Sequence, residues 1–454
     1  MAKEGRIHKY ILNDKNIVLD INTGAVHLVD DVVYNILDYY VDSTVDEIVE
    51  LLKNKYEEKV IRQAYYEIKT LEEEGLLYSE GIKVEDVKYN EANIVKALCL
   101  HVAHDCNLRC KYCFASQGDF KGDRSLMSLE VGKRALDFLV ENSGNRRNLE
   151  VDFFGGEPLM NFELVKELVY YGRRLEKENN KHFRFTITTN GVLLDDEKID
   201  FINEHMDNVV LSLDGRKEIN DNMRKTISGE GSYDIILPKI KNMVEKRGDK
   251  DYYIRGTFTR YNMDFSKDAL DFYEHGFKKI SIEPVVTSPD KDYALREEDL
   301  EIILKEYEDF SKEYIKIKKR DKDFLFFHFM IDLNQGPCLV KRVVGCGAGS
   351  EYMAVTPEGD LYPCHQFVGD EKFKMGNVFE GIINTQIREE FKKANVYNKE
   401  ECSTCWARFY CSGGCHANAY NFHQDIKKPY KIGCEMEKKR IECAISILAN
   451  INDY

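Results

Sequence analysis

Short apolar runs separated by longer segments of helical periodicity fill the middle of the chain. In the intervening segments, apolar positions recur every three or four residues, as on one face of a helix. This alternation predicts an α/β fold in which parallel strands are joined by right-handed helical crossovers. Six strands are too few for a closed eight-stranded barrel. The runs are residues 94–102, 149–154, 183–189, 209–213, 252–258 and 280–285.

The first 80 residues carry a different pattern and predict a separate unit. Two alternating segments flank a turn at Asn13 to Lys15, and a third short strand follows. Asp30 or Asp31 can cap the first of three amphipathic helices, which end near Gly75. A small sheet followed by three helices is winged-helix-like. The expected strands are residues 7–12, 17–21 and 25–28.

Composition excludes several classes of protein. The net charge is −15 with dispersed Lys and Arg, and residues 1–90 hold 11 Lys or Arg against 19 Asp or Glu, so nucleic acid is not the expected partner. No apolar run reaches the ~18 residues of a membrane span, and the N-terminus lacks a signal-peptide pattern, which predicts a cytoplasmic protein without a membrane partner. Thirteen cysteines in such a chain predict metal ligation rather than disulfides.

Three cysteines are concentrated in one loop after the first barrel strand. Cys106, Cys110 and Cys113 lie within eight residues, on a loop too short to bury them in a core. Three thiolates suit a [4Fe-4S] cluster with one iron left open for a chelating molecule. The alternative is a tetrahedral zinc site in which His104 supplies the fourth ligand.

The spacing C-x3-C-x-aromatic-C resembles the signature of radical S-adenosylmethionine (SAM) enzymes. That resemblance implies a partial (β/α)6 barrel whose chemistry lies at the C-terminal ends of the strands. Gly155-Gly156-Glu157-Pro158 matches the family's GGEP motif, where glycines admit a ligand and Glu157 holds the methionyl amino group. Arg224 is implied to hold the methionyl carboxylate. The residues expected around SAM are Tyr112, Gly155, Gly156, Glu157, Thr189, Asn190, Ser212, Asp214, Arg224, Glu283 and Val285.

A second concentration of cysteines lies in the last quarter of the chain and resembles the seven-cysteine SPASM pattern. That pattern implies two further [4Fe-4S] clusters, hence three in all. The inner cluster then lacks a fourth ligand, which Cys338 or a substrate cysteine can supply. A zinc ribbon is the alternative, although only one C-x2-C pair is present. The implied ligands are Cys346, Cys364 and Cys415 for the inner cluster and Cys402, Cys405, Cys411 and Cys434 for the outer cluster, whereas Cys99 and Cys443 are expected in the core.

The whole chain resembles radical SAM/SPASM peptide maturases, most of all the thioether-forming maturases of SCIFF peptides, which have six cysteines in forty-five residues. Residues 1–80 resemble leader-recognition domains, which bind a substrate leader as an added strand. The expected organisation is this domain, a linker over residues 81–93, the barrel over residues 94–330 and the SPASM domain over residues 331–454. The expected partners are a cysteine-rich precursor peptide and an electron donor such as flavodoxin or ferredoxin.

The resemblance also implies a mechanism. A 5′-deoxyadenosyl radical formed from SAM removes hydrogen from a peptide carbon, a substrate cysteine sulfur bonds to that carbon, and the remaining electron leaves through the auxiliary clusters. One feature departs from the sulfatase maturases of this family, in which an acidic base follows the cysteine matching Cys364, because His365 stands there instead. Sulfatase-type oxidation, quinone-cofactor maturation and a non-catalytic iron–sulfur carrier or leader-binding scaffold remain as alternatives.

Overall fold

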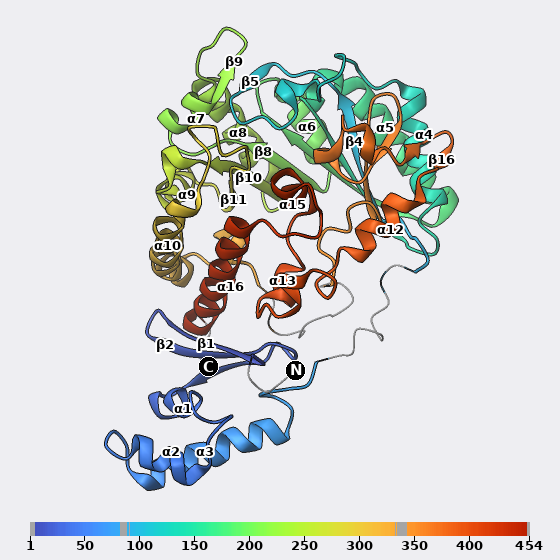
Figure 1. Cartoon of the computed structure of the whole chain (residues 1–454). Coiled ribbons are helices and arrows are strands. Elements are labelled where there is room, and N and C mark those ends of the chain that lie inside the picture. Colours follow the sequence, from blue (N-terminus) through green and yellow to red (C-terminus); the bar gives the residue numbers. More distant parts are fainter. Residues whose placement is uncertain (1–4, 82–88, 90, 332, 334–342, 452–454) are drawn as a thin grey trace.

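In the computed structural model, which describes residues 5–81, 89, 91–331, 333 and 343–451, a large twisted sheet organises most of the chain (Figure 1). Its strand order is β12-β11-β10-β8-β7-β6-β4-β13-β14-β15-β16. The six strands predicted from the apolar runs are neighbours in this sheet and pair in parallel, which confirms the partial (β/α)6 barrel. They are β4 (Ala97–Ala103), β6 (Asn148–Gly155), β7 (His182–Thr189), β8 (Asn208–Ser212), β10 (Asp251–Phe258) and β11 (Lys279–Pro284).

The barrel strands bury one face under helices and leave the other face polar. Along β6, Leu149, Val151 and Phe153 are buried in the core, whereas Glu150 is exposed and Asp152 is half-buried. This alternation follows from the period of two in a strand. The covering helices include α4 (Leu129–Glu141), α5 (Phe162–Asn179), α6 (Asp196–His205), α8 (Tyr233–Arg247) and α9 (Phe265–Glu274).

The first unit has the predicted antiparallel sheet followed by three helices. Its hairpin turns at Asn13 and Asp14, whose φ angles of 50° and 60° are the left-handed values that tight hairpins need. Asp30 is the cap of the first helix, because its side chain accepts the backbone N–H of Val33 at 2.9 Å. The elements are β1 (Ile7–Leu12), β2 (Lys15–Asp20), β3 (Val26–Val29), α1 (Asp31–Ile36), α2 (Val45–Leu52) and α3 (Glu58–Glu73).

The C-terminal part continues the barrel sheet, which the sequence did not predict. β13 (Tyr352–Val355) pairs in parallel with β4, the first strand of the barrel, and so covers an edge that would otherwise be open. β14 (Asp360–Tyr362), β15 (Gly376–Asn377) and β16 (Gly381–Ile382) extend the sheet in antiparallel pairs. The short β12 (Leu325–Phe326) lies at the opposite edge of the sheet. The helices of the C-terminal part are α12 (Thr385–Lys393), α13 (Glu400–Ser403), α14 (Arg408–Cys411), α15 (His416–His423) and α16 (Lys431–Ile451).

Helix α16 joins the three parts of the molecule. It packs along α10 (Leu300–Arg320) of the barrel, and its residues Ile441 and Ile445 contact Ile17 and Leu19 of the N-terminal sheet. In Figure 1 this helix stands between the barrel and the N-terminal unit. The N-terminal unit is therefore seated against the C-terminal part through a buried apolar contact.

Some expectations fall outside what the structure describes. Cys338 lies outside the described residues, as does most of the expected linker over residues 81–93. The domain boundaries at residues 80, 93 and 330 stay predictions. Within the described part of the chain, no helix is long and apolar enough to cross a membrane.

Candidate active site

A cavity at the C-terminal ends of β6, β7 and β8 brings together most of the residues expected around SAM. The three thiols of the cysteine loop share its wall with the glycine-rich turn and with Arg224. This is where parallel α/β barrels place their chemistry. Of the expected residues, Cys106, Cys110, Cys113, Tyr112, Gly155, Gly156, Glu157, Thr189, Asn190, Ser212 and Arg224 line the cavity.

The cysteine loop is held by a strand pair that the sequence did not reveal. β5 (Leu108–Cys110) pairs antiparallel with β9 (Arg224–Thr226), so that Cys110 lies opposite Arg224. Backbone N–H of Lys111 donates to the carbonyl of Met223 at 2.9 Å. The loop is thus fixed to the segment that follows the fourth barrel strand. This pairing sets the positions of the Cys110 thiol and the Arg224 guanidinium relative to each other.

The two glycines of the GGEP turn are needed for packing against the cysteine loop. A Cβ on Gly155 would lie 2.2 Å from the carbonyl oxygen of Ala103, and one on Gly156 would lie 2.1 Å from that of Asp105. Gly155 also has a φ of 129°, which L side chains rarely adopt. From the sequence, these glycines are expected to make room for a ligand. In the structure they also let the turn pack closely against the backbone of Ala103 and Asp105, just before Cys106.

Glu157 is buried and ties the ends of two strands together. Its Oε1 accepts from the Thr189 hydroxyl at 2.7 Å and from the backbone N–H of Leu159 at 3.0 Å, and its Oε2 accepts from the backbone N–H of Asn190 at 2.8 Å. Burial raises the pKa of this carboxyl, and the hydrogen bonds oppose the rise. Because a carboxylate offers about four acceptor sites, Oε2 retains one that can take an ammonium proton from a ligand.

Tyr112, Asp214 and Arg224 form a buried polar unit beside the thiols. The Tyr112 hydroxyl donates to Asp214 Oδ2 at 2.6 Å and accepts from Arg224 Nη1 at 2.9 Å. Burial raises the pKa of Asp214, and the Arg224 charge opposes this. Arg224 Nε is buried and has no hydrogen-bond partner among the described residues. An unpaired buried donor on the cavity wall fits an anionic ligand group such as a carboxylate.

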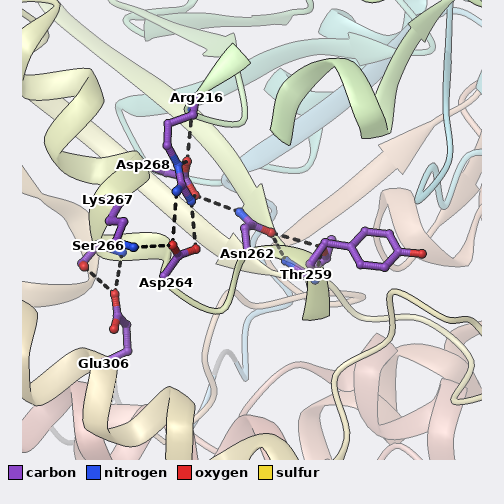
Figure 2. A network of polar contacts seen from close by, with 9 residues as sticks. Arg216, Thr259, Asn262, Asp264, Ser266, Lys267, Asp268 and Glu306 are labelled. Atoms are coloured by element: carbon purple, nitrogen blue, oxygen red, sulfur yellow. Dashed lines mark hydrogen bonds and ion pairs between the residues drawn. The ribbon is translucent and has the colours of Figure 1, made fainter. Parts of the chain in front are cut away.

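An ionic network behind this unit fixes the loop that carries Asp214 (Figure 2). Arg216 donates from Nε to Asp268 at 2.8 Å and from Nη2 to Asp264 at 2.8 Å, and Asn262 donates to Asp268 at 2.9 Å. Gly215 approaches so closely that a Cβ there would lie 2.3 Å from the Asp268 Cβ. The loop after β8 is therefore anchored to the start of α9.

Three of the residues expected around SAM do not line this cavity. Asp214 accepts from Tyr112, which does line it. The Glu283 carboxylate accepts from the Ser281 hydroxyl at 2.9 Å and lies 3.3 Å from His328 Nε2. Val285 is buried in the core, and its backbone N–H donates to the carbonyl of Phe258 at 2.8 Å. The contacts of Glu283 and Val285 with SAM stay predictions.

Aromatic side chains and His365 lie between this cavity and the second cysteine group. The His365 ring is 5.4 Å from the Phe114 ring and 5.2 Å from the Phe154 ring, and both phenylalanines line the cavity. His365 Nδ1 lies 3.1 Å from the Tyr352 hydroxyl. Burial lowers the pKa of His365 to about 4, so the ring is neutral near pH 7. The residue after Cys364 thus faces the barrel interior.

The resemblance implies two groups among the seven cysteines of the C-terminal part. Burial raises the pKa of Cys364, and the charges of Cys415 and Cys346 raise it further, so these two lie near it. A separate cavity is lined by the other four, next to Ile7 and His8 of β1. These four are Cys402, Cys405, Cys411 and Cys434.

The donor sets fit iron–sulfur clusters. Burial raises the pKa of Cys106 to about 12 and that of Cys110 to about 11, so these thiols are thiolates only when positive charge compensates them, as bound iron does. Near the second group, the ammonium of Lys399 is fully buried. Three thiols on one cavity wall suit a [4Fe-4S] cluster with one iron left open to a ligand.

One residue and one strand pairing of these sites could not be predicted from the sequence. Lys399 belongs to no recognised motif, and the one signal in the sequence is its position three residues before Cys402. The partnership of β9 with the cysteine loop depends on the tertiary fold, because the segments are more than 100 residues apart.

Comparisons with known proteins agree with this arrangement. Residues 100–264 match the model of the radical SAM superfamily, and residues 346–406 match the SPASM model, an iron–sulfur cluster-binding domain. The chain is 27% identical over 374 residues to a cysteine-type anaerobic sulfatase-maturating enzyme of Clostridium novyi, covering 76% of this chain and 94% of that protein. It is 23% identical over 452 residues to the radical SAM cyclopropyl synthase TigE of Paramaledivibacter caminithermalis, covering 93% of this chain and 87% of that protein.

Solved structures share the fold. Native anSMEcpe with bound AdoMet matches with a TM-score of 0.66 at 23% identity, over 79% of this chain and all of that chain (100%). Streptococcus suis SuiB bound to precursor peptide SuiA matches with a TM-score of 0.53 at 16% identity, over 95% of this chain and 99% of that chain. The second match extends over the N-terminal unit as well as the barrel.

Proposed function

We propose that this chain is a radical SAM enzyme with a SPASM iron–sulfur domain and that it forms thioether cross-links in a ribosomally made, cysteine-rich precursor peptide. The observation that carries the proposal is the cavity in which three thiols, the Glu157 carboxylate and the Arg224 guanidinium meet at the strand ends. When bound there, a [4Fe-4S] cluster and SAM supply a 5′-deoxyadenosyl radical, which removes a hydrogen atom from the substrate.

In this proposal the protein holds SAM by its two charged ends. Glu157 Oε2 takes the methionyl ammonium with its remaining acceptor site, and Arg224 Nε donates to the methionyl carboxylate. Cys106, Cys110 and Cys113 would hold the cluster and leave one iron open to SAM. Tyr112 and Asp214 keep the guanidinium oriented. Glu157 has a second role, because its hydrogen bonds to Thr189 and Asn190 hold the ends of β6 and β7 together.

The wall toward the inner cysteine group keeps water from the reacting carbon. Phe114, Phe154 and the neutral ring of His365 pack together there. A reactive carbon radical needs such an apolar enclosure to avoid side reactions. We propose that Cys346, Cys364 and Cys415 hold the inner auxiliary cluster behind this wall and that Cys402, Cys405, Cys411 and Cys434 hold the outer one, giving three clusters in all.

The N-terminal sheet offers a place for the leader of the peptide. β3 is an edge strand, and a groove beside it is lined by its residues and by apolar side chains of α16, including Ile445 and Leu448. An extended peptide can add to such an edge through backbone hydrogen bonds, while the groove accepts alternate side chains. The fold match to SuiB with its precursor peptide supports a peptide substrate, because it includes this unit.

Our proposal of thioether formation draws on the sequence around the inner cysteines. The segment from Cys346 to Cys364 and on through His365 to Phe367 resembles the SCIFF maturases. In the structure His365 and not a carboxylate faces the barrel interior, so the acidic group expected of a sulfatase maturase is not supplied from this position.

The test of this assignment is SAM cleavage by anaerobically reconstituted protein with a chemical reductant. Unaltered protein is expected to form 5′-deoxyadenosine, and a variant with Cys106, Cys110 and Cys113 replaced by Ala is expected to form none while keeping its auxiliary iron. A Cys99→Ala variant is the matched control, since Cys99 is a buried core thiol outside the cavity. Equal 5′-deoxyadenosine from the triple variant would refute the site, and no cleavage by any variant would favour a non-catalytic carrier or scaffold.

A further inference from the structure

Lys399 is a buried lysine situated between the two C-terminal cysteine groups. Its side chain is 0% exposed, and its Nζ donates to the carbonyl of Gly413 at 2.6 Å. Gly413 stands between Cys411 of the outer group and Cys415 of the inner group in the chain. The backbone carbonyl of Lys399 accepts the N–H of Cys402 at 3.0 Å, so the residue also fixes an outer-group ligand.

A buried ammonium needs negative charge nearby, and among the described residues the cysteines supply it. Burial lowers the pKa of Lys399, and the charges that oppose this come from thiolates of both groups. Its Nζ donates to one neutral carbonyl, that of Gly413, which does not offset the loss of hydration of a full charge. The thiolates concerned are those of Cys402, Cys411, Cys415 and Cys434.

From this geometry we propose that Lys399 is a positioning residue that raises the reduction potentials of the auxiliary clusters through its fixed positive charge. The inference rests on the proposed ligation of two clusters by these cysteines. Reduction by one electron makes a cluster one unit more negative, and a cation held in a dry environment stabilises that state. Because Lys399 faces ligands of both groups, its charge favours electron acceptance by both clusters.

The role differs from that of other lysines in the region. Lys438 lies near Cys405 and Cys434 but pairs with Glu435 at 2.8 Å, so its charge is already compensated. Lys393, on α12, is exposed, and water screens its charge. Lys399 is set apart from both because it combines complete burial with thiolates of two groups.

The experiment uses the full chain with Cys106, Cys110 and Cys113 replaced by Ala, so that only the auxiliary clusters remain. Iron and sulfide are quantified after anaerobic reconstitution, and the clusters are titrated with dithionite and redox mediators while EPR follows the reduced state. Lys399, Lys399→Met and Lys399→Arg are compared, and Lys393→Met is the matched control. Lack of auxiliary iron in the protein that retains Lys399 would overturn the proposed cluster ligands themselves.

With iron bound, Lys399→Met is expected to lower the equilibrium constant for one-electron reduction at least tenfold, a shift of ~59 mV to lower potential. Lys399→Arg is expected to stay near the unaltered protein, and Lys393→Met to match it. Loss of auxiliary iron in Lys399→Met but not in Lys399→Arg would support the same need for positive charge. Unchanged potentials in Lys399→Met would overturn the inference, and so would a Lys399→Arg protein that behaves like Lys399→Met, since packing and not charge would then be decisive.

Discussion

At the scale of single residues, the hydroxyl of Tyr112 is the contact on which the charged wall of the cavity depends. It is the shared partner of Asp214 and Arg224, both buried. Removing it takes one hydrogen bond from the buried Asp214 carboxylate and one from the buried Arg224 guanidinium, at a cost of about 1–3 kcal/mol.

Tyr112→Phe is therefore expected to weaken SAM binding by roughly tenfold to a hundredfold, as measured by equilibrium dialysis with reconstituted protein. The ring remains, so cluster content should be unchanged. Tyr170→Phe on α5 is the control, since Tyr170 is 54% exposed. Unaltered SAM affinity in Tyr112→Phe would show that Arg224 does not contact SAM through this arrangement.

Asp152 gives the barrel interior a pH-dependent stability. Burial raises its pKa to about 7, although Arg255 lowers it. A carboxyl whose pKa is raised on folding stabilises the protein fully only below its unfolded pKa of about 3.9, and this contribution is lost as the pH rises through about 7. The amide in Asp152→Asn cannot ionise, so this variant does not lose stability as the pH rises.

Asp152→Asn is thus expected to gain stability relative to the unaltered protein as the pH is raised from about 5 to about 8. The gain in the free energy of unfolding is at most about 4 kcal/mol and is seen as a higher melting temperature. Circular dichroism of the anaerobic holoprotein measures it. Asp251→Asn is the control, because Asp251 and Asp152 line the same cavity, one separate from the SAM cavity. Lys279 lowers the pKa of Asp251, so this carboxyl is ionised throughout the range. A pH-independent difference for Asp152→Asn would contradict the assignment.

What the sequence could predict at this scale depends on whether a residue belongs to a local pattern. The spacing of Cys106, Cys110 and Cys113 identifies a ligand set by itself, and the structure brings the three to one cavity. Glu283 has no such local signature, because its position in the barrel follows from how far each strand extends. His328, which lies 3.3 Å from it, comes from a segment 45 residues later, so this contact could not be predicted from the strand.

At the scale of elements, the free edge of β3 is where the account can be tested for peptide recognition. Backbone N–H of Asp20 donates to the carbonyl of Ala25 at 2.8 Å, and hydrogen-bonded pairs alternate along antiparallel strands. Leu28, opposite Ile17, is then a non-hydrogen-bonded position whose N–H points to the edge. An added strand would use that N–H.

Leu28→Pro removes this donor and is expected to weaken binding of the full precursor at least tenfold, as measured by fluorescence anisotropy, since proline cannot pair at an edge in this orientation. Slow SAM cleavage without peptide should be unaffected. Leu28→Ala keeps the N–H and controls for loss of the side chain, which is 39% exposed. Equal affinity of Leu28→Pro and the unaltered protein would refute the β3 edge as the leader site.

The same scale shows why the barrel strands were predicted and their neighbours were not. Each of the six strands has its own apolar run, which a period of two or a continuous buried stretch makes visible. β9 and β13 are three and four residues long, and their position depends on pairing with β5 and β4 across the fold. Short strands of this kind leave no periodic signal.

At the scale of the whole molecule, the N-terminal unit is joined to the loop between two outer-group cysteines. The His8 ring stacks on Trp406 with centroids 3.8 Å apart, and Arg408 donates to Asn22 at 2.9 Å. Removing residues 1–80 would also expose the apolar face of α16 around Ile441, so point variants at the sheet edge are the sharper test of leader binding. The N-terminal unit and the cysteine-rich C-terminal part are thus in direct contact (Figure 1).

The central claim is that this enzyme joins a cysteine sulfur to a carbon in a cysteine-rich precursor peptide. Its most direct test is mass spectrometry of a SCIFF-type precursor after anaerobic incubation with reconstituted enzyme, SAM and reductant, followed by alkylation of free thiols. Each bridge is expected to remove two hydrogen atoms and one alkylatable thiol, in step with 5′-deoxyadenosine. Formation of 5′-deoxyadenosine with every peptide thiol still alkylated would contradict thioether formation.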